Sequence, residues 1–383
     1  TKQRTSKQSH SFRIISLHHT PSLTYCLSKL HRDHPTTMPA PETPFQPYAH
    51  LHKDVQGPGD ARPTALQIVK DCGANGKLTN KTILITGCSS GIGVETARAL
   101  YETGAKLFLT ARDVPKLQRV IDDIVNKSES KGLQRPEALE LHLDELASVR
   151  KAAEDFKKRS SQLNMLINNA GVMACPPSKT KDGLELQIGT NHFARFLLFQ
   201  LLKPLLIQSA KESGTTSRVI NLSSAGHRFG GVKLDDVNLE KDYDKWLSYG
   251  QSKTANIYMA NSIDRHYGSQ NVHGWSVHPG GIMTELGRHL SEDDFKAMGF
   301  DSLMESFFKS PEQGAATTVW AAVSPHFEGG NGGRYLAEVG ECGPVPQGAE
   351  MMADGYAPHA YNEDAEEKLW KLSCDIVGVP ADD

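Results

Sequence analysis

The chain lacks any apolar run long enough to cross a bilayer: none of its 383 residues belongs to a stretch near the ~18–20 uninterrupted apolar residues that a membrane-spanning helix needs. It also lacks a charge excess, because 42 Lys and Arg face 45 Asp and Glu, for a formal net charge of −3. Nucleic-acid binders need a basic surface, so we expect no nucleic-acid partner. What remains is the composition of a globular protein, with 38% hydrophobic residues.

Cysteines are few, and none of the 6 stands in a Cys-x-x-Cys pair. Zinc clusters and disulfide frameworks depend on closely spaced cysteines, so this pattern predicts neither, and no metal is expected. In a chain of this length, scattered cysteines are typical of reduced, partly buried residues. We therefore expect a cytoplasmic protein without a transmembrane segment.

Residues 1–37 are rich in Ser, Thr, His and basic residues and contain a single acidic residue, Asp33. Because Met38 is the first methionine, two interpretations stay open: a targeting segment, or residues that are not part of the native protein. Both predict a disordered N-terminal tail. Residues 38–79 form a Pro/Gly-rich N-terminal extension, with one short helix predicted near Ala65–Asp71.

Over residues 80–380, short β-branched or leucine-rich runs alternate with long amphipathic stretches. Strands are predicted at Thr82–Thr86, Lys106–Thr110, Leu139–Leu143, Met165–Asn168, Arg218–Leu222, Val272–Val277 and Arg334–Leu336. Helices are predicted between them at Gly91–Thr103, Val114–Lys127, Leu146–Ser160, Leu184–Ser209, Ser248–Tyr267 and Pro311–Val323. This alternation predicts a single doubly wound Rossmann-type α/β domain, with about seven parallel strands and helices on both faces.

A glycine-rich turn, Thr86-Gly87-x3-Gly91-x-Gly93, joins the first strand to the first helix of this domain. Glycines allow a tight turn and a close backbone approach to a pyrophosphate, which the N-terminus of the helix then attracts. The second strand ends in Ala111-Arg112, where NAD-binding proteins carry an acidic residue for the ribose hydroxyls. Arg112 instead offers a planar fork to a 2′-phosphate, so NADP(H) is predicted and NAD is less favoured.

Asp144 ends the third predicted strand, where it can contact an adenine amino group or cap the following helix. Both interpretations stay open. Arg112 likewise has an alternative, as a surface charge paired with Asp113.

Tyr249 and Lys253 lie one helical turn apart on the same face of a predicted helix. A phenol is a poor base at neutral pH, but a fixed ammonium nearby stabilises the phenolate and lowers its pKa. Such a tyrosine can exchange a proton with a substrate oxygen. Ser224 follows the predicted strand Arg218–Leu222 and can donate a hydrogen bond to a carbonyl oxygen on which negative charge develops.

Further polar residues stand at two strand ends and in one of the predicted helices. Asn168-Asn169 ends the fourth strand, and Asn191 lies in the helix that follows. His278-Pro279-Gly280 ends the sixth strand, with Thr284 placed to reach a nicotinamide carboxamide. We expect His278 to be structural rather than catalytic.

Taken together and in this order, these motifs resemble those of the short-chain dehydrogenase/reductase family over residues 80–375. The Thr-Ala-Arg-Asp end of the second strand, residues 309–316 and Gly333-Arg334-Tyr335-Leu336 are similar to the branch of retinol dehydrogenases and WW-domain oxidoreductases.

The resemblance implies a role for each matching residue. Tyr249 would be the general acid/base, and Lys253 would lower its pKa and bind the nicotinamide ribose. Ser224 would polarise the substrate carbonyl, and Asn191 would hold a proton-relay water. The remaining positions would contact the cofactor: Gly87, Ser89, Gly91, Ile92, Gly93, Arg112, Asp144, Asn169, Pro279 and Thr284.

We therefore expect an NADP(H)-dependent oxidoreductase that interconverts a carbonyl and an alcohol on a small hydrophobic substrate by hydride transfer. Two alternatives stay open: reduction of an activated carbon–carbon double bond, or a non-catalytic NADP(H)-sensing protein. A homodimer also stays open. The expected substrate pocket contains the apolar side chains of Phe229, Trp246, Met283, Phe295, Met298, Phe300, Phe307 and Phe308.

Overall fold

A computed structural model of the chain describes residues 43–297, 304–346, 348 and 353–381. The predicted N-terminal tail, together with Met298 and Phe300, therefore lies outside the described residues, and of Phe295 only the backbone is described. No helix among the described residues is both long and apolar enough to span a membrane.

The described residues form an 8-stranded sheet in the order β3-β2-β1-β4-β5-β6-β7-β8. The strands are β1 (Thr82–Ile85), β2 (Lys106–Ala111), β3 (Glu137–Glu140), β4 (Met165–Asn168), β5 (Ser217–Leu222), β6 (Val272–Val277), β7 (Arg334–Ala337) and β8 (Gly340–Glu341). All neighbouring pairs are parallel except the short β8, which runs antiparallel to β7. The order reverses between β1 and β4, which confirms the doubly wound Rossmann-type domain.

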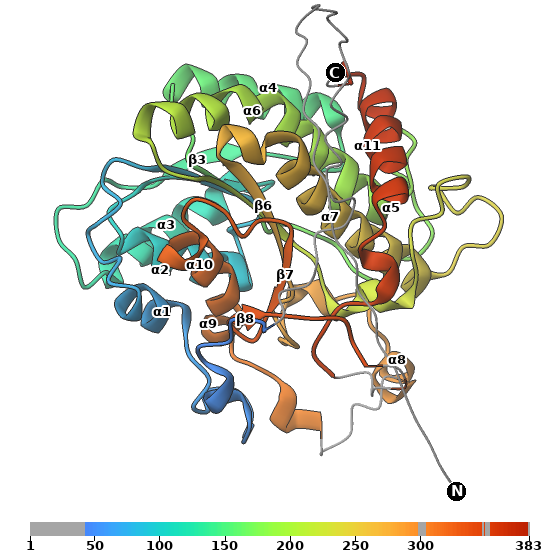
Figure 1. Cartoon of the computed structure of the whole chain (residues 1–383), viewed down its shortest axis with the longest axis horizontal. Helices are drawn as coiled ribbons and strands as arrows, with labels where there is room; N and C mark the ends of the chain where they lie inside the picture. The colour runs from blue at the N-terminus through green and yellow to red at the C-terminus, as the bar shows by residue number, and fades with distance from the viewer. Residues whose placement is uncertain (1–42, 298–303, 347, 349–352, 382–383) are drawn as a thin grey trace, which may run out of the picture. The chain divides into compact units, whose positions relative to one another are not determined.

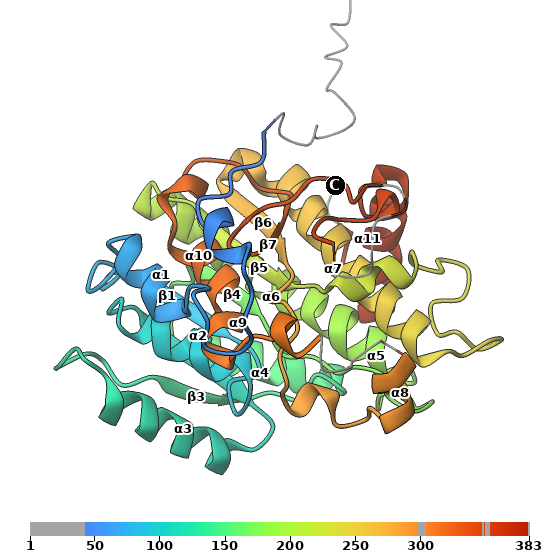
Figure 2. The same cartoon turned by 90° about the horizontal axis from the view of Figure 1, so that it is seen from below.

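Helices cover both faces of the sheet (Figures 1 and 2). One face carries α1 (Ala65–Asp71), α2 (Ile92–Tyr101), α3 (Val114–Lys127) and α10 (Ala316–Val323). The other carries α4 (Leu146–Arg159), α6 (Ala194–Ser213), α7 (Lys245–Tyr267) and α11 (Glu363–Val377). Buried Trp320 and Trp370 stand in the two separate cores on either side of the sheet. The central strands β1 and β4 are buried along their whole length because helices cover both faces.

Three predicted segments differ most from the structure. The helix predicted at Pro311–Val323 is divided into α9 (Pro311–Gly314) and α10. The third strand is Glu137–Glu140 rather than Leu139–Leu143, because Glu137 and Ala138 already pair with β2 at the sheet edge, where Glu140 stays exposed. The predicted helix Leu184–Ser209 is divided into α5 (Leu186–Ile188), the π-helical η2 (Gly189–Phe193) and α6. Helix α11 has no counterpart among the sequence predictions.

The N-terminal extension is more structured than its composition suggests. Helix α1 forms where predicted, Thr64 caps it by accepting a hydrogen bond from the Gln67 N–H, and Ile68 and Val69 join the core against α2 and α10. Shorter elements complete the chain: η1 (Ala49–His52), η3 (Ala225–Phe229), η4 (Gly268–Gln270), η5 (Glu285–Gly287), α8 (Glu292–Ala297), η6 (Met304–Phe307), α9 (Pro311–Gly314), η7 (Pro325–Phe327) and η8 (Pro358–Ala360).

Candidate active site

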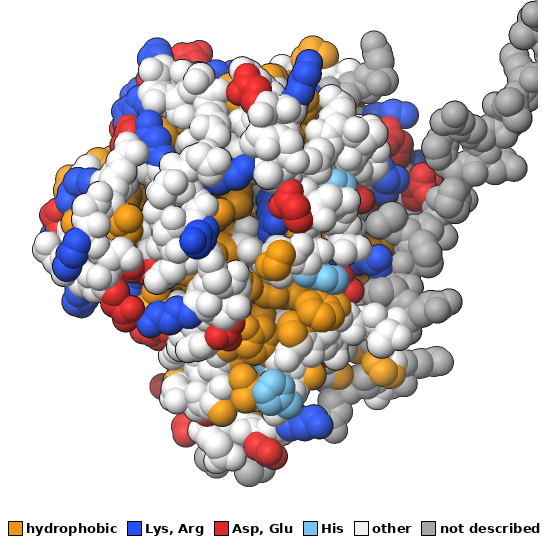
Figure 3. Space-filling view, turned by 60° about the vertical axis from the view of Figure 1, so that its left-hand side comes forward, with side chains coloured by type: hydrophobic (Ala, Val, Ile, Leu, Met, Phe, Trp, Pro, Cys, Tyr) orange, Lys and Arg blue, Asp and Glu red, His pale blue; other side chains and the backbone are white. Residues whose placement is uncertain are grey.

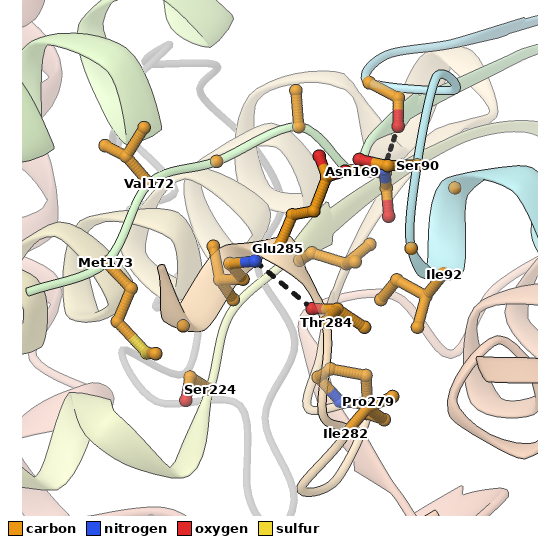
Figure 4. Close-up of a pocket in the computed structure, with 18 of the residues that line it drawn as sticks. Ser90, Ile92, Asn169, Val172, Met173, Ser224, Pro279, Ile282, Thr284 and Glu285 are labelled. Carbon is orange, nitrogen blue, oxygen red and sulfur yellow. Dashed lines mark hydrogen bonds between the residues drawn. The ribbon is translucent and has the colours of Figure 1, made fainter. Parts of the chain in front are cut away.

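A cavity of about 840 Å³ opens at the carboxyl ends of the central strands. Open α/β sheets bind their ligands outside this edge. In the view of Figure 4, Ser90, Ile92 and Asn169 lie toward one side of the cavity and Met173 and Ser224 toward the other. We call the side with Ser90, Ile92 and Asn169, together with the tip of β2, the turn end. We call the side with Met173 the apolar end.

The glycine-rich turn between β1 and α2 has no room for side chains. A Cβ on Gly87 would lie 2.7 Å from the Cα and Cβ of Ala170, and a Cβ on Gly93 would lie 2.2 Å from the carbonyl oxygen of Gly87. Gly91, the N-cap of α2, has a φ of 63°. The turn thus leaves backbone N–H groups at the start of α2 open to an anion. All five residues predicted here line the cavity: Gly87, Ser89, Gly91, Ile92 and Gly93.

Asn169, at the end of β4, braces this turn. Its Nδ2 donates to the carbonyl oxygens of Thr86 at 2.8 Å and Gly87 at 3.1 Å. Its Oδ1 is buried and has no hydrogen-bond partner among the described residues. One acceptor of the side chain is therefore unused, and contact of Asn169 with the cofactor stays a prediction.

Arg112 is exposed at the tip of β2 and lines the cavity. The alternative pairing with Asp113 is wrong, because the Asp113 carboxylate caps α3 by accepting the Lys116 N–H at 2.8 Å, and no ion pair within the described part of the chain includes Arg112. The Lys116 ammonium lies 3.2 Å from the Glu285 carboxylate across the cavity. Arg112 is thus a cation of this end of the cavity without an ion pair among the described residues, and Lys116 is a second one that is paired with Glu285.

Asp144 is half-buried and lines the same end of the cavity. It does not cap the following helix: α4 has Glu145 as its N-cap, and the Leu146 N–H donates to Asp182 at 2.9 Å. Of the two interpretations, capping is wrong, while contact with an adenine stays a prediction.

Pro279 and Thr284, which follow β6, also line the cavity. Thr284 Oγ1 accepts the Leu286 N–H at 3.3 Å, a bond drawn in Figure 4, and a Cβ on Gly91 would lie 3.5 Å from the Thr284 Cβ. Thr284 therefore faces the glycine-rich turn. His278 accepts the Ala225 N–H on Nδ1 at 3.2 Å, which agrees with the structural role expected for it.

Ser224, Tyr249 and Lys253 meet at the floor of the cavity. Ser224 follows β5, and its Oγ and the Tyr249 ring lie side by side at Gly226, where a Cβ would lie 3.4 Å from the Ser224 Oγ and 2.7 Å from the Tyr249 Cε1. The Lys253 Nζ lies 5.4 Å from the centre of the Tyr249 ring and donates to the Leu222 carbonyl oxygen at 3.1 Å. The spacing along the sequence had predicted this convergence of Tyr249 and Lys253 on one helix face.

The electrostatics of this cluster differ from the prediction. Burial raises the pKa of Tyr249 to about 12, although the hydrogen bond with Ser224 and the charge of Arg195 oppose that rise. Burial, and then the charge of Arg195, lower the pKa of Lys253 well below its ordinary value. Desolvation therefore outweighs the mutual effect of the two side chains in the protein alone.

Asn191 lies in the π-helical turn η2 and is fully buried. Its Oδ1 accepts the Val172 N–H at 2.9 Å, and its Nδ2 donates to the Val172 carbonyl at 2.9 Å and to Ser252 Oγ at 3.0 Å. The side chain thus fixes the strand-to-helix connection after β4. A role in holding a water stays a prediction.

The comparisons with known proteins agree with this geometry. The family model for short chain dehydrogenases matches residues 81–294. The chain belongs to the short-chain dehydrogenase/reductase family. It is 45% identical to a short-chain dehydrogenase/reductase, prx1, of Penicillium roqueforti over 87% of this chain and 95% of that protein. It is 36% identical to human retinol dehydrogenase 11 over 81% of this chain and 90% of that protein.

Solved structures show the same fold. A protein from Mycobacterium paratuberculosis has a TM-score of 0.59 at 28% identity and covers 79% of this chain and 95% of its own. RhlG of Pseudomonas aeruginosa, solved with NADP, has a TM-score of 0.53 at 24% identity over 67% of this chain and 94% of its own. This chain is therefore a short-chain dehydrogenase/reductase oxidoreductase that resembles the retinol dehydrogenase branch.

The family binds nicotinamide cofactors, and the turn end fits one. A Cβ on Gly87 would collide with Ala170 and one on Gly93 with the Gly87 carbonyl oxygen, so glycine keeps this turn tight, and no side chain among the described residues caps the N-terminus of α2. The unused Oδ1 of Asn169 and the exposed Arg112 supply an acceptor and a cation at the same end.

The apolar end is lined by Phe229, Trp246, Met283, Phe307 and Phe308, as predicted. Met283 is 61% exposed, and Phe229 and Phe307 are also exposed. Figure 3 shows a face of the molecule on which hydrophobic side chains gather, with histidines among them.

Sequence reasoning missed the residue that holds this apolar end. Arg62, from the N-terminal extension, is buried and ion-paired with Asp60 at 2.8 Å. Its guanidinium donates to the carbonyl oxygens of Phe307 at 3.0 Å, Ser306 at 3.3 Å and Phe308. No local signal marks it, because 245 residues separate Arg62 from Phe307.

Proposed function

We propose that this protein is an NADP(H)-dependent oxidoreductase that interconverts a carbonyl and an alcohol on a small hydrophobic substrate, with Tyr249 as the general acid/base. The convergence of Ser224 and Tyr249 beside Gly226, with the Lys253 Nζ 5.4 Å from the centre of the Tyr249 ring, carries this proposal. These groups line the same cavity as the residues of the turn end and of the apolar end. A proton donor there can reach a substrate oxygen at the point where a cofactor and a substrate meet.

The chain's own residues would orient the substrate and move the proton. The high pKa of Tyr249 keeps its hydroxyl protonated at neutral pH, which is the form needed to donate to a carbonyl oxygen. Ser224 would donate a second hydrogen bond to that oxygen as charge develops on it. NADPH, when bound, supplies the reducing hydride.

Preference for NADP(H) is supported by the tip of β2. Ala111 removes the carboxylate that would repel a 2′-phosphate, and Arg112 is exposed on the cavity with no acidic partner among the ion pairs of the described residues. A guanidinium binds phosphate oxygens with two parallel hydrogen bonds. Asp144, Asn169, Pro279 and Thr284 are proposed to line the rest of the cofactor.

A hydrophobic substrate is supported by the five apolar side chains of the apolar end and by the similarity to retinol dehydrogenases 11 and 14, whose names give an apolar alcohol as the substrate. A cytoplasmic location is supported by five free cysteines among the described residues, because reduced thiols are typical of that compartment. Cell fractionation tests the location.

The test of the activity is Tyr249→Phe in the full chain. We expect NADPH binding, followed by fluorescence, to stay nearly unchanged, while reduction of aliphatic, aromatic and polycyclic carbonyls falls by about a thousandfold or more. NADPH consumption is the readout. Turnover that survives in Tyr249→Phe would show that another group moves the proton, and a wild-type protein that binds NADPH but reduces no carbonyl would favour the non-catalytic alternative.

A further inference from the structure

The loop that follows β6 forms part of the cavity wall. Residues 279–284 of this loop all line the cavity, and Pro279, Ile282 and Thr284 are labelled along it in Figure 4. Gly280 has a φ of 100°, a conformation that favours glycine. Because the loop is not a strand of the sheet, its conformation depends on the side chains that pack against it.

Lys309 packs directly against this loop. Its backbone N–H donates to the Gly281 carbonyl oxygen at 2.8 Å, and a Cβ on Gly280 would lie 2.9 Å from the Lys309 Cδ and 3.0 Å from its Nζ. The Lys309 side chain is 3% exposed and does not line the cavity. The packing of this lysine can therefore affect a bound ligand only through the loop.

Glu338 holds the ammonium group of Lys309. One carboxylate oxygen of Glu338 accepts from the Lys309 Nζ at 2.7 Å, and the other contacts the Nδ1 of His52 in the N-terminal extension. Burial acts to raise the pKa of Glu338, but the charge of Lys309 and then the contact with His52 outweigh it and hold that pKa well below its ordinary value. Glu338 is therefore a carboxylate near neutral pH, and its contact with Lys309 is an ion pair.

The hairpin that carries Glu338 is strained. Glu338 and Val339 form the two-residue connection between the antiparallel strands β7 and β8. Their φ angles are 51° and 56°, in the left-handed region that suits glycine or asparagine and that a β-branched valine disfavours. The Val339 N–H donates to Thr317 Oγ1 at 3.1 Å, and the Glu338 carboxylate binds Lys309. Backbone strain persists where such contacts enforce it, and it clusters at functional sites.

We infer that Lys309 and Glu338 are positioning residues of the cofactor site: their ion pair fixes the loop after β6 in the conformation that receives the nicotinamide cofactor. This inference rests on the proposed function, in which Pro279 and Thr284 of the same loop contact that cofactor. Without the ion pair, the loop would populate other conformations. Binding would then have to restore the competent conformation, and the apparent affinity would fall by the fraction in which it is populated.

The experiment compares two variants of the full chain. Lys309→Met keeps an unbranched stem against Gly280 but removes the charge. Glu338→Asn suits the positive φ of the hairpin but is uncharged and too short to hold Lys309. NADPH dissociation constants are measured by fluorescence titration, and thermal denaturation confirms that each protein is native. We expect the affinity to fall by about tenfold in either variant, which corresponds to a competent loop populated to about a tenth.

The direction of the change in Glu338→Asn separates positioning from a direct effect of charge. Loss of the carboxylate leaves the cation of Lys309 uncompensated, and that charge alone would attract the anionic cofactor more strongly. A weaker affinity in this variant therefore supports positioning. The double variant should bind NADPH about as weakly as the weaker single variant, because both substitutions break the same contact.

Lys179→Met is the matched control, because Lys179 forms an exposed ion pair with Glu240 at 2.6 Å. It should leave the affinity for NADPH unchanged. An unchanged or higher affinity in Glu338→Asn would overturn the inference and leave the pair a contribution to stability alone. If Lys309→Met does not fold, Glu338→Asn decides by itself. A wild-type chain that binds neither NADPH nor NADH would refute the proposed function, and this inference with it.

Discussion

The turn end of the cavity is built from short turns that follow neighbouring strands, whereas the apolar end is assembled from segments that are distant in the sequence. At the turn end, Gly87 and Gly93 contact each other and Asn169 through the backbone. At the apolar end, the carbonyls of Phe307 and Phe308 are held by Arg62 from the N-terminal extension. The turn end is therefore fixed by close packing of backbone atoms, whereas the apolar end is held by the hydrogen bonds of one side chain. We expect substitutions to change the shape of the apolar end more easily than that of the turn end.

The largest effect should come from closing the turn end. In Gly93→Ala, the new Cβ meets the Gly87 carbonyl oxygen at 2.2 Å and the Asn169 Nδ2 at 2.5 Å, so the turn must shift. We expect NADPH affinity, measured by fluorescence titration, to fall by about a hundredfold or more. Gly343→Ala is the matched control, because nothing lies within 4 Å of a Cβ there. Unchanged affinity in Gly93→Ala would mean that the turn is not the phosphate site.

Charge at the tip of β2 should have the next largest effect. Arg112→Asp replaces an exposed cation with the acidic residue that suits ribose hydroxyls. The ratio of kcat/KM with NADPH to that with NADH should fall by about tenfold to a hundredfold. The exposed Arg119, changed to Asp, serves as control. Selectivity that does not change would assign the 2′-phosphate to another cation, for which Lys116 is the first choice.

Acid should weaken the region beside the apolar end. His227 is fully buried, and its Nε2 accepts the Ala357 N–H at 2.9 Å. Burial lowers its pKa to about 4, below the ordinary value of about 6.5, so the unfolded chain binds more protons between these pH values. The stability that His227 contributes is complete above about pH 6.5 and is lost as the pH falls toward 4.

Urea denaturation should therefore show a loss on the order of 1–2 kcal/mol between pH 7 and pH 5 from this group. His227→Gln should reduce this pH dependence relative to the wild type. A pH dependence in His227→Gln that is identical to that of the wild type would contradict the assignment.

The smallest effect should come from loosening the apolar end. Arg62→Lys keeps the positive charge beside Asp60. A lysine ammonium, however, lacks the planar set of N–H donors with which the guanidinium binds three carbonyl oxygens. KM for bulky carbonyls should rise by about threefold to fivefold, while kcat and NADPH affinity change little. Arg119→Lys is the control on the surface. A loss of NADPH affinity in Arg62→Lys would show that the two ends are coupled.

Much of the fold and the turn end could be predicted from sequence because their signals are local. Helix α3 and strands β4 and β6 have their predicted bounds, since each is an uninterrupted periodic run. Tyr249 and Lys253 meet because residues four apart share a helix face. The bounds of β3 were wrong because pairing at a sheet edge, not leucine content, decides where that strand begins.

What the sequence by itself determined is the order of strands and helices, the glycine-rich turn and the chemistry of the residues at the strand ends, because each depends on neighbours a few positions away. Only the tertiary structure decided the charge balance around Tyr249 and the shape of the apolar end. Arg195 stands in an apolar helical run, and Arg62 lies in the N-terminal extension, so nothing local marks either one. Burial is a property of the whole fold, and it is burial that sets the cost of each charge.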